Sequence, residues 1–465
     1  MRLAELVPQH EAQRYITNGC CQLRGTTENV TFSPPTGLPS SSETGSRPTI
    51  ANRRFGASRF DAIRQDPVLS RLVLATFVST LGRGVFLTLT VLYFTLIVGL
   101  PAIQVALLLT ISSAIGVGTS YLGGHLADQF SARRLVTWLV IVEAVALACY
   151  PLATSFGAAL AVACVVTATE RAANSTRGAI IARAFTGQRR VGARAVLRTV
   201  TNIGISLGSA AGGLALLIAT PTAYRTVMII AAVVTGASAF LLSRLPDYVD
   251  APQHVPESGV AAPVRGRSPF RNPKYLALTV LSGIFGMQFG VAEVGLPLWI
   301  VNETSAPSAV YSLLLILNTV LVILFQVRLS RGTHDVAHAG KVSVLAGLLM
   351  VVACGLYAGS ADLAIGMAIV LLLAAMAVHS FAEVLSSASN WGLSFELADQ
   401  SRAGAYQGLF AMGYSLGSMA APLVISATVL THGVLGWVIL AAIFLASSVG
   451  IHLLAKHHLK TLPAH

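Results

Sequence analysis

The stretch GGHLADQFSARR, residues 123–134, places one carboxylate and two cations at the end of a long apolar run. Only four residues separate Asp128 from Arg133, so the chain can do little more there than turn and begin a second apolar run. A carboxylate in such a turn can be stabilised by the positive N-terminus of another helix and by nearby arginines. The pattern therefore predicts two tightly connected helices with fixed charge at their shared end.

The composition of the whole chain excludes a soluble globular protein. Of its 465 residues, 54% are hydrophobic and only 11% are charged, whereas soluble domains carry about 25% charged residues. The mean hydropathy is +0.71. The apolar runs are about 20 residues long and contain Gly and Pro, which is typical of membrane-spanning helices rather than barrel strands. We therefore expect an integral membrane protein.

Twelve apolar runs follow a polar tail at residues 1–66, which is rich in Ser, Thr, Pro, Gly and Arg and is expected to be mostly disordered. The runs cover residues 70–98, 102–126, 135–154, 157–181, 195–219, 223–243, 275–301, 307–327, 341–359, 363–387, 404–430 and 434–455.

Lys and Arg concentrate in alternate connections between the runs. The connections on one side, with their flanks and both ends of the chain, carry 23 cations, whereas the other side carries only Arg225. Short loops rich in Lys and Arg remain in the cytoplasm, so we expect both termini to be cytoplasmic. This distribution, without runs of like charge, argues against a nucleic-acid surface. The Arg-rich, Ala-rich composition points to a bacterial inner membrane.

The longest connection, residues 244–274, divides the runs into two groups of six. Three features of the first half recur in the second half, 206 to 213 residues further along the chain, which indicates a duplicated unit. The matching pairs are GISLGS at 204–209 with GYSLGS at 413–418, Gly84–Tyr93 with Gly290–Trp299, and Glu170 with Glu383. We expect an all-α fold in which 12 transmembrane helices form two pseudo-symmetric six-helix bundles. The predicted parts are a tail (1–66), a first bundle (67–243), a cytoplasmic central loop (244–274), a second bundle (275–455) and a cytoplasmic C-terminal tail (456–465).

Twelve spans, a central loop and GGHLADQFSARR together resemble the major facilitator superfamily, which carries a G-x-L-a-D-R-x-G-x-R-R type signature between its second and third helices. The matching residues are Gly124, Leu126, Asp128, Arg133 and Arg134, whereas Gln129 and Ser131 depart from the pattern. The resemblance implies alternating access, in which two six-helix halves rock about a site near the midplane. It also implies a cytoplasmic gate, in which the aspartate contacts the N-terminus of the eleventh helix.

Ionisable residues within the runs are costly at mid-bilayer and need a partner or a watery cavity. In the superfamily, helices 1, 4, 7 and 10 line the central cavity. The candidate proton and substrate residues on these helices are Arg83, Glu170, Arg171, Gln288, Glu293, His379 and Glu383.

Arg83 and Glu170 each lie about 13 residues into their runs, near the midplane, and are the best candidate ion pair. Arg171 is adjacent to Glu170 and cannot face the same way, so we expect it to point elsewhere, toward Glu143. One functional interpretation is that Glu170, Glu293 or Glu383 carries a proton across the membrane. The alternative is that these residues form static ion pairs that hold the helices together.

Four glycines in the fifth run form a further candidate motif: Gly204, Gly208, Gly212 and Gly213. The spacing of four puts the first three on one helix face and allows another helix to approach closely. As a set they resemble the G-x-x-x-G-P-x-x-G-G motif of superfamily exporters, with Ser209 in place of the proline. The resemblance implies antiport, which is export against proton entry.

The predicted function is proton-coupled export of a small amphipathic or cationic organic compound by a monomer in the lipid bilayer. Two alternatives remain open: proton-coupled uptake of a nutrient or organic acid gripped by Arg83 and Arg171, and a membrane sensor or scaffold that transports nothing. The chain contains no G-x-x-x-x-G-K-[ST] loop for nucleotide and no pattern of a catalytic triad or metal site. We therefore expect a protein that is not an enzyme and uses a proton gradient, with no cofactor or metal.

Overall fold

The computed structural model describes residues 66–218, 220–250 and 266–461. Over these residues the protein contains helices and no strand, and twelve helical segments are long and apolar enough to cross a membrane. The predicted all-α fold with twelve spans is therefore confirmed. The predicted disordered tail at 1–66 and most of the central loop lie outside the described residues.

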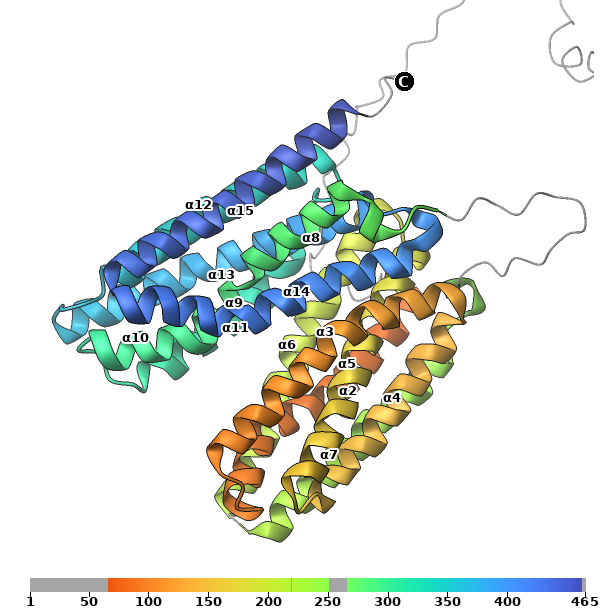
Figure 1. The fold of residues 1–465 in the computed structure, drawn as a ribbon, viewed down its shortest axis with the longest axis horizontal. Coiled ribbons are helices and arrows are strands. Elements are labelled where there is room, and N and C mark those ends of the chain that lie inside the picture. Colours follow the sequence, from red (N-terminus) through yellow and green to blue (C-terminus); the bar gives the residue numbers. More distant parts are fainter. Residues whose placement is uncertain (1–65, 219, 251–265, 462–465) are drawn as a thin grey trace, which may run out of the picture. The chain divides into compact units, whose positions relative to one another are not determined.

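The first half contains six spans, and the second half contains six more in eight helices (Figure 1). The first six helices are α2 (Pro67–Leu92), α3 (Ala102–Gln129), α4 (Ala132–Cys149), α5 (Phe156–Ala184), α6 (Gly187–Ile218) and α7 (Pro221–Ser243). The other eight are α8 (Pro273–Gly286), α9 (Gln288–Gly290), α10 (Leu296–Glu303), α11 (Val310–Leu329), α12 (Val336–Ala358), α13 (Ile365–Glu396), α14 (Ala403–Ile425) and α15 (Val434–Lys460).

Local sequence explains where several helices begin. Asp66 precedes Pro67 and accepts hydrogen bonds from the N–H groups of Val68 and Leu69, both at 3.0 Å. An acidic N-cap followed by proline at the first helical position satisfies exposed N–H groups and sets the backbone angle of the helix. Asn272 and Pro273 begin α8 in the same way.

The seventh span is interrupted where the sequence weakens the helix. It runs from Pro273 to Glu303 through α8, α9, a π-helical turn at Val291–Gly295 and α10. Pro297 stands four residues after Glu293, and a proline cannot donate the hydrogen bond that would normally return to that carbonyl. The interruption places Glu293 in an irregular turn inside the membrane-spanning segment.

Glycine contacts repeat between the two halves. A Cβ added at Gly208 of α6 would lie 3.0 Å from the Cα of Gly84 in α2, and one added at Gly417 of α14 would lie 3.1 Å from the Cα of Gly283 in α8. The duplicated GxSLGS segments therefore pack against the first helix of their own half. In this contact Gly283 takes the place of Gly84, seven residues before the Gly290 with which the sequence aligns Gly84.

Apolar packing is unequal at the two ends of the bundles. We call the linker end the end at which the central connection begins and resumes, at residues 244–250 and 266–272. One core at the linker end joins buried residues of both halves, including Leu72, Leu197, Tyr275 and Leu409. Toward the opposite end, each half has its own core. The two halves are thus packed together at the linker end and separately beyond it.

Candidate functional site

Asp128 joins the two halves at the linker end. Its carboxylate accepts hydrogen bonds from the N–H groups of Gly404 at 2.8 Å and Ala405 at 2.7 Å, in the first turn of α14. Arg183 of α5 donates to the same carboxylate at 2.5 Å. No side chain of its own caps the start of α14, so Asp128 from the other half supplies the negative charge that a helix N-terminus favours.

This contact is the one that the family resemblance implies, and glycines make it possible. A Cβ added at Gly124 would lie 2.8 Å from the Cα of Gly408, so α3 and α14 approach more closely than side chains would allow. One turn deeper, the hydroxyls of Ser120 and Ser415 are 3.4 Å apart. Leu126 is half-buried beside this contact.

The paired arginines of the motif lie away from Asp128. Arg133 forms an ion pair with Asp247 and donates a hydrogen bond to the carbonyl of Leu245 at 3.0 Å, in the segment that follows α7. Arg134 is exposed. The cation that neutralises Asp128 is instead Arg183, which follows the predicted fourth run (157–181) and lies in the last turn of α5.

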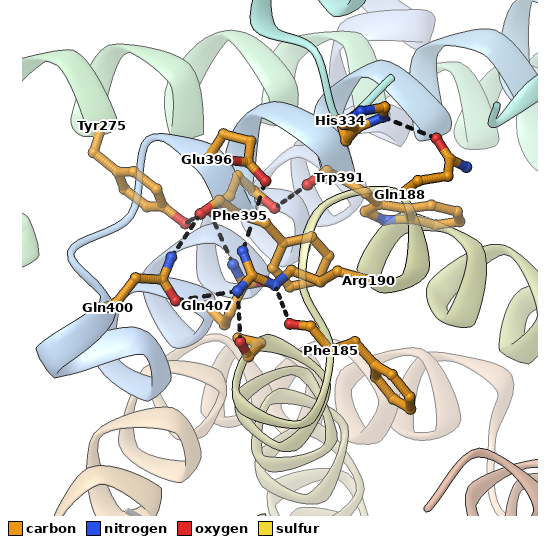
Figure 2. A network of polar contacts seen from close by, with 12 residues as sticks. Phe185, Gln188, Arg190, Tyr275, His334, Trp391, Phe395, Glu396, Gln400 and Gln407 are labelled. Atoms are coloured by element: carbon orange, nitrogen blue, oxygen red, sulfur yellow. Dashed lines mark hydrogen bonds and ion pairs between the residues drawn. The ribbon is translucent and has the colours of Figure 1, made fainter. Parts of the chain in front are cut away.

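A second contact between the halves centres on Arg190 (Figure 2). Its guanidinium donates to the carbonyl of Phe185 at 3.0 Å and to Gln400 at 3.3 Å, and one nitrogen lies 3.7 Å from Glu396. The same guanidinium stacks over Phe395, 5.5 Å from the ring centroid. Because Arg190 is buried and belongs to the first half, it fixes the end of α13 against α6.

Gln188 extends this contact toward α11 and α12. Its side-chain oxygen accepts a hydrogen bond from the N–H of Gly332 at 2.7 Å and lies 3.0 Å from a ring nitrogen of His334 (Figure 2). Its side-chain nitrogen lies 3.4 Å from the carbonyl of Ser330. The connection between α11 and α12 therefore sits on the start of α6, much as the connection between α3 and α4 sits on α14.

Helix α6 begins earlier than the sequence predicts, so the connection between the fourth and fifth spans is shorter than expected. The predicted fifth run begins at residue 195, with Arg190 and Arg194 in the connection before it and Arg198 at its edge, whereas α6 begins at Gly187. A spacing of four puts these three arginines on one face of the helix. That periodicity was present in the sequence and would have identified the stripe. Arg194 and Arg198 consequently lie within the span and not at its linker end.

A charged cavity of about 220 Å³ lies above this stripe, between α2, α4, α5, α6 and α13. Its polar lining includes hydroxyl and amide groups as well as charges, and Trp391 is its contribution from the second half. The charged residues that line it are Arg83, Glu143, Glu170, Arg177, Arg194 and Arg198.

Arg83 and Glu170 form the expected ion pair in this cavity, with 2.6 Å between Arg83 Nη1 and Glu170 Oε1. The expected approach of Arg171 to Glu143 was wrong. Arg171 forms no ion pair with any described residue, and its Cγ would lie 3.1 Å from a Cβ at Gly116 of α3. Successive residues of a helix point about 100° apart, so a Glu170 side chain in the cavity directs Arg171 outside it.

Glu383 connects the halves near the middle of the membrane. Its carboxylate forms an ion pair with Arg198 of α6 and accepts a hydrogen bond from Asn318 of α11 at 2.9 Å. Arg198 lies 11 residues into α6 and Glu383 lies 13 residues before the end of α13, which is ~17–20 Å from the linker end at ~1.5 Å per residue. This is the deepest polar contact between the halves in the described chain.

The other candidate residues of the second half, His379, Gln288 and Glu293, do not gather at a single site. His379 is buried and its ring nitrogen lies 3.3 Å from the hydroxyl of Tyr357, while Gln288 is buried and donates to Ser386 at 3.0 Å. The polar contacts of both side chains are therefore made within the second half. Glu293 is exposed and lies in the π-helical turn of the seventh span.

Three of the four glycines in α6 pack against α2. A Cβ added at Gly204 would lie 3.0 Å from the Cβ of Thr80, and one at Gly212 would lie 3.1 Å from that of Thr88. Gly208 packs between them, on Leu81 and Gly84, whereas Gly213 has open space around it. The motif therefore includes three glycines that pack on α2 and one, Gly213, at which an added Cβ would meet open space.

The described polar contacts between the halves share one side of the protein. Each hydrogen bond and ion pair that joins them in residues 66–218, 220–250 and 266–461 lies between the linker end and the Arg198–Glu383 pair. Together with the shared apolar core, they close the path between the halves at the linker end. The polar cavity meets the deepest of these contacts, because Arg198 lines it.

Comparison with known proteins finds the same architecture. The sequence profile of the Major Facilitator Superfamily matches residues 72–422, while no curated protein sequence matches. The human organic anion transporter MFSD10 (TETRAN) is similar in structure, with a TM-score of 0.63, 16% identity, and coverage of 83% of this chain and 99% of that one.

Two further structures are similar at 13% identity. A bacterial homologue of the iron transporter ferroportin, in an outward-facing state, has a TM-score of 0.67 and is covered over 99% of its length, against 84% of this chain. The transporter FucP, in an outward conformation, has a TM-score of 0.66, with coverage of 98% of that chain and 84% of this one. At 13–16% identity, the similarity to these solved structures shows a shared fold only. Membership of the family is shown by the sequence profile, which matches residues 72–422. The chain therefore belongs to the Major Facilitator Superfamily and is a multi-pass membrane transporter rather than an enzyme.

Proposed function

We propose that this transporter exports a small amphipathic organic compound in exchange for protons, by alternating access. The observation that supports this most directly is the closure of one end: the described hydrogen bonds and ion pairs between the halves lie between the linker end and the Arg198–Glu383 pair, whose arginine lines the charged cavity. Breaking these contacts and closing the opposite end would expose the same cavity to the other side of the membrane.

The topology belongs to the same proposal. Even without the arginines that now lie inside α6, the connections at the linker end remain the cation-rich ones. By the positive-inside rule we expect this end and both termini to face the cytoplasm, and we propose that the membrane is a bacterial inner membrane. The closed cytoplasmic end then makes the described conformation outward-facing. We propose that the protein functions as a monomer.

Proton coupling is supported by two carboxylates that are paired with arginines, one pair between the halves and one within the first half. Glu383 holds Arg198 of the other half, so the pair must separate when the halves move apart. Glu170 lies in the same cavity with Arg83. A carboxylate that loses its arginine in a low-dielectric site can take up a proton. We propose Glu383 and Glu170 as the proton carriers and the proton gradient as the energy source, with no cofactor or metal.

Export rather than uptake is supported by the contact between α6 and α2, which is built from Gly204, Gly208 and Gly212 and resembles the exporter motif. The uptake of an organic acid is the second candidate, because four arginines line the cavity. A cationic substrate is less favoured than the sequence alone indicated, because Glu170 and Glu383 are both occupied by arginines.

Flux measurements in proteoliposomes test this function. The purified full chain is reconstituted with a pH-sensitive dye inside, a pH gradient is imposed, and a panel of amphipathic anions, cations and neutral compounds is added on either side. We expect at least one compound to move protons, with movement opposite to the compound. Parallel movement of compound and proton would establish uptake instead, and no coupled flux for any compound would favour the sensor or scaffold.

The Glu→Gln variants test the carriers in the same assay. We expect Glu383→Gln or Glu170→Gln to abolish proton coupling while the protein remains folded. Asp247→Gln serves as the control, because Asp247 is a highly exposed acid outside the cavity. Intact coupling in both cavity variants would contradict the assignment of these two carboxylates.

A further inference from the structure

The arginine stripe of α6 contains a cation without a protein counter-charge. Arg194 lines the cavity and forms no hydrogen bond or ion pair with any described residue. Its one described polar interaction is with the face of Trp391, 5.7 Å from the ring centroid. A guanidinium within the membrane-spanning region is costly unless an anion or water satisfies it.

Neighbouring arginines also have unused donors. Two nitrogens of Arg177, Nε and Nη2, are buried and have no hydrogen-bond partner, and the same is true of Nε in Arg198. Buried N–H groups nearly always have a partner in folded proteins. Three arginines around one cavity therefore have donors that the described residues leave unsatisfied.

The acids of the cavity do not supply the missing acceptors. Glu170 is paired with Arg83, and Glu383 divides its two oxygens between Arg198 and Asn318. Glu143 lies in the cavity but forms no ion pair within the described residues. Four arginines line the cavity, against Glu143 and Glu170 in its wall and Glu383 paired with Arg198, so the remaining positive charge favours a negatively charged occupant.

Aromatic rings hold the arginines in place for such an occupant. Arg198 lies over Phe289, 5.1 Å from the ring centroid, and also 5.8 Å from the centroid of Trp391, which Arg194 faces as well. Stacking fixes the plane of a guanidinium and leaves its edge free for bidentate hydrogen bonds to a carboxylate. The rings also provide apolar surface next to the charges.

We infer that this cavity binds the carboxylate of a small amphipathic organic anion between Arg194 and Arg198, with Arg177 beside them. The volume of about 220 Å³ is below the ~300–1,000 Å³ of sites for drug-sized ligands, so the ligand is small. The inference rests on the proposed transport function and specifies its substrate class.

Glu383 would compete with a bound carboxylate for Arg198. Glu383 occupies Arg198 from the other half, so an incoming carboxylate must share or displace it. Displacement would release the deepest polar contact between the halves and leave Glu383 free to take up a proton. Binding of the anion and loosening of the two halves would thus be the same event.

Binding of simple probes to the purified full chain in lipid nanodiscs tests the inference by calorimetry. Benzoate is the probe, and benzylammonium and benzyl alcohol are matched cationic and neutral controls. We expect benzoate to bind and the two controls to bind at least 10-fold more weakly. Arg194→Gln should weaken benzoate binding roughly 10-fold or more, since a charge-assisted pair is lost.

Glu383→Gln should tighten benzoate binding because it removes the competitor, an effect that a general loss of structure cannot produce. Arg134→Gln is the matched control, because Arg134 is exposed at the linker end, and it should leave binding unchanged. Equal binding of benzoate and benzylammonium, no binding of benzoate, or an unchanged affinity in Arg194→Gln would overturn the assignment.

The same variants separate this inference from the transport proposal. If benzoate binds through Arg194 but no compound gives proton-coupled flux, the anion site stands and the transport function fails. If coupled flux occurs and Arg194→Gln leaves both flux and binding intact, transport stands and the anion site is refuted.

Discussion

Replacing Asp128 by asparagine should shift the protein away from the conformation that is closed at the linker end. The carboxylate accepts three hydrogen bonds, from Gly404 at 2.8 Å, Ala405 at 2.7 Å and Arg183 at 2.5 Å, and the side chains of Asp128 and Arg183 are only 10% and 12% exposed. An asparagine amide can accept with one oxygen and has no charge. At least two of the three contacts therefore change from charge-assisted to neutral or are lost.

The size of the shift follows from these contacts. A hydrogen bond to a charged group contributes about 1–1.5 kcal/mol more than a neutral one, so two such changes disfavour the closed end by about 2–3 kcal/mol. At 1.36 kcal/mol per factor of ten, the ratio of closed to open molecules should fall ~30- to 150-fold. The helix and its fold should be retained, because the asparagine side chain has nearly the same volume as the aspartate that it replaces.

Distances between spin labels measure that ratio. Cysteines at Arg134 and Arg331, both exposed at the linker end of opposite halves, would be labelled in a background lacking the five native cysteines. Double electron–electron resonance should show the short distance in the parent protein and a growing long-distance population in Asp128→Asn. Asp247→Asn is the control, because its ion pair with Arg133 stays within the first half and its linker. Identical distance distributions in the parent and Asp128→Asn would refute the reasoning.

Three further perturbations test the packing, the cavity pair and the topology. Gly208→Ala should lower the melting temperature in detergent, by an overpacking cost of about 1–3 kcal/mol, because a Cβ there would collide with α2, whereas Gly213→Ala should not because no atom lies within 4 Å; equal effects would contradict the proposed packing role. Arg83→Gln with Glu170→Gln should show a coupling free energy of about 1 kcal/mol in a double-mutant cycle of unfolding, a modest value because the side chains are 37% and 24% exposed and screened by water, and additive effects would argue against a stabilising pair. A fluorescent protein fused after the last residue should fluoresce in bacterial cells if the C-terminus is cytoplasmic, while a periplasmic phosphatase fused there should be inactive; the reverse result would invert the topology.

The gate motif shows how far sequence reasoning reaches. The turn after Asp128 and the approach of its carboxylate to the eleventh span followed from the motif and its place in the chain. The counter-ion did not follow, because Arg183 and Arg133 are both arginines near the same end. Which of them faces Asp128 depends on the direction in which each helix face points once the bundle has formed.

The arginines of α6 were misplaced for a different reason. Hydropathy identifies only the apolar part of a span. Where a helix continues into charged residues, as α6 does before residue 195, hydropathy does not detect the continuation. The predicted fifth run therefore left Arg194 in the loop and Arg198 at its own edge, although their spacing of four already fitted a helix face. Their role became clear only when Glu383 of α13 was found opposite Arg198.

The amino-acid sequence by itself determined the class of protein, the twelve spans and the division into two halves, because every backbone polar group in a bilayer must be satisfied within the helix, so that about 20 apolar residues suffice to specify a span. The tertiary structure alone decided which charges meet. One step along a helix turns a side chain by about 100°, so the sequence alone could not show that Arg171 lies outside the cavity while Arg194 faces it. Helix packing makes that selection, and it gives the cavity wall more arginines than glutamates.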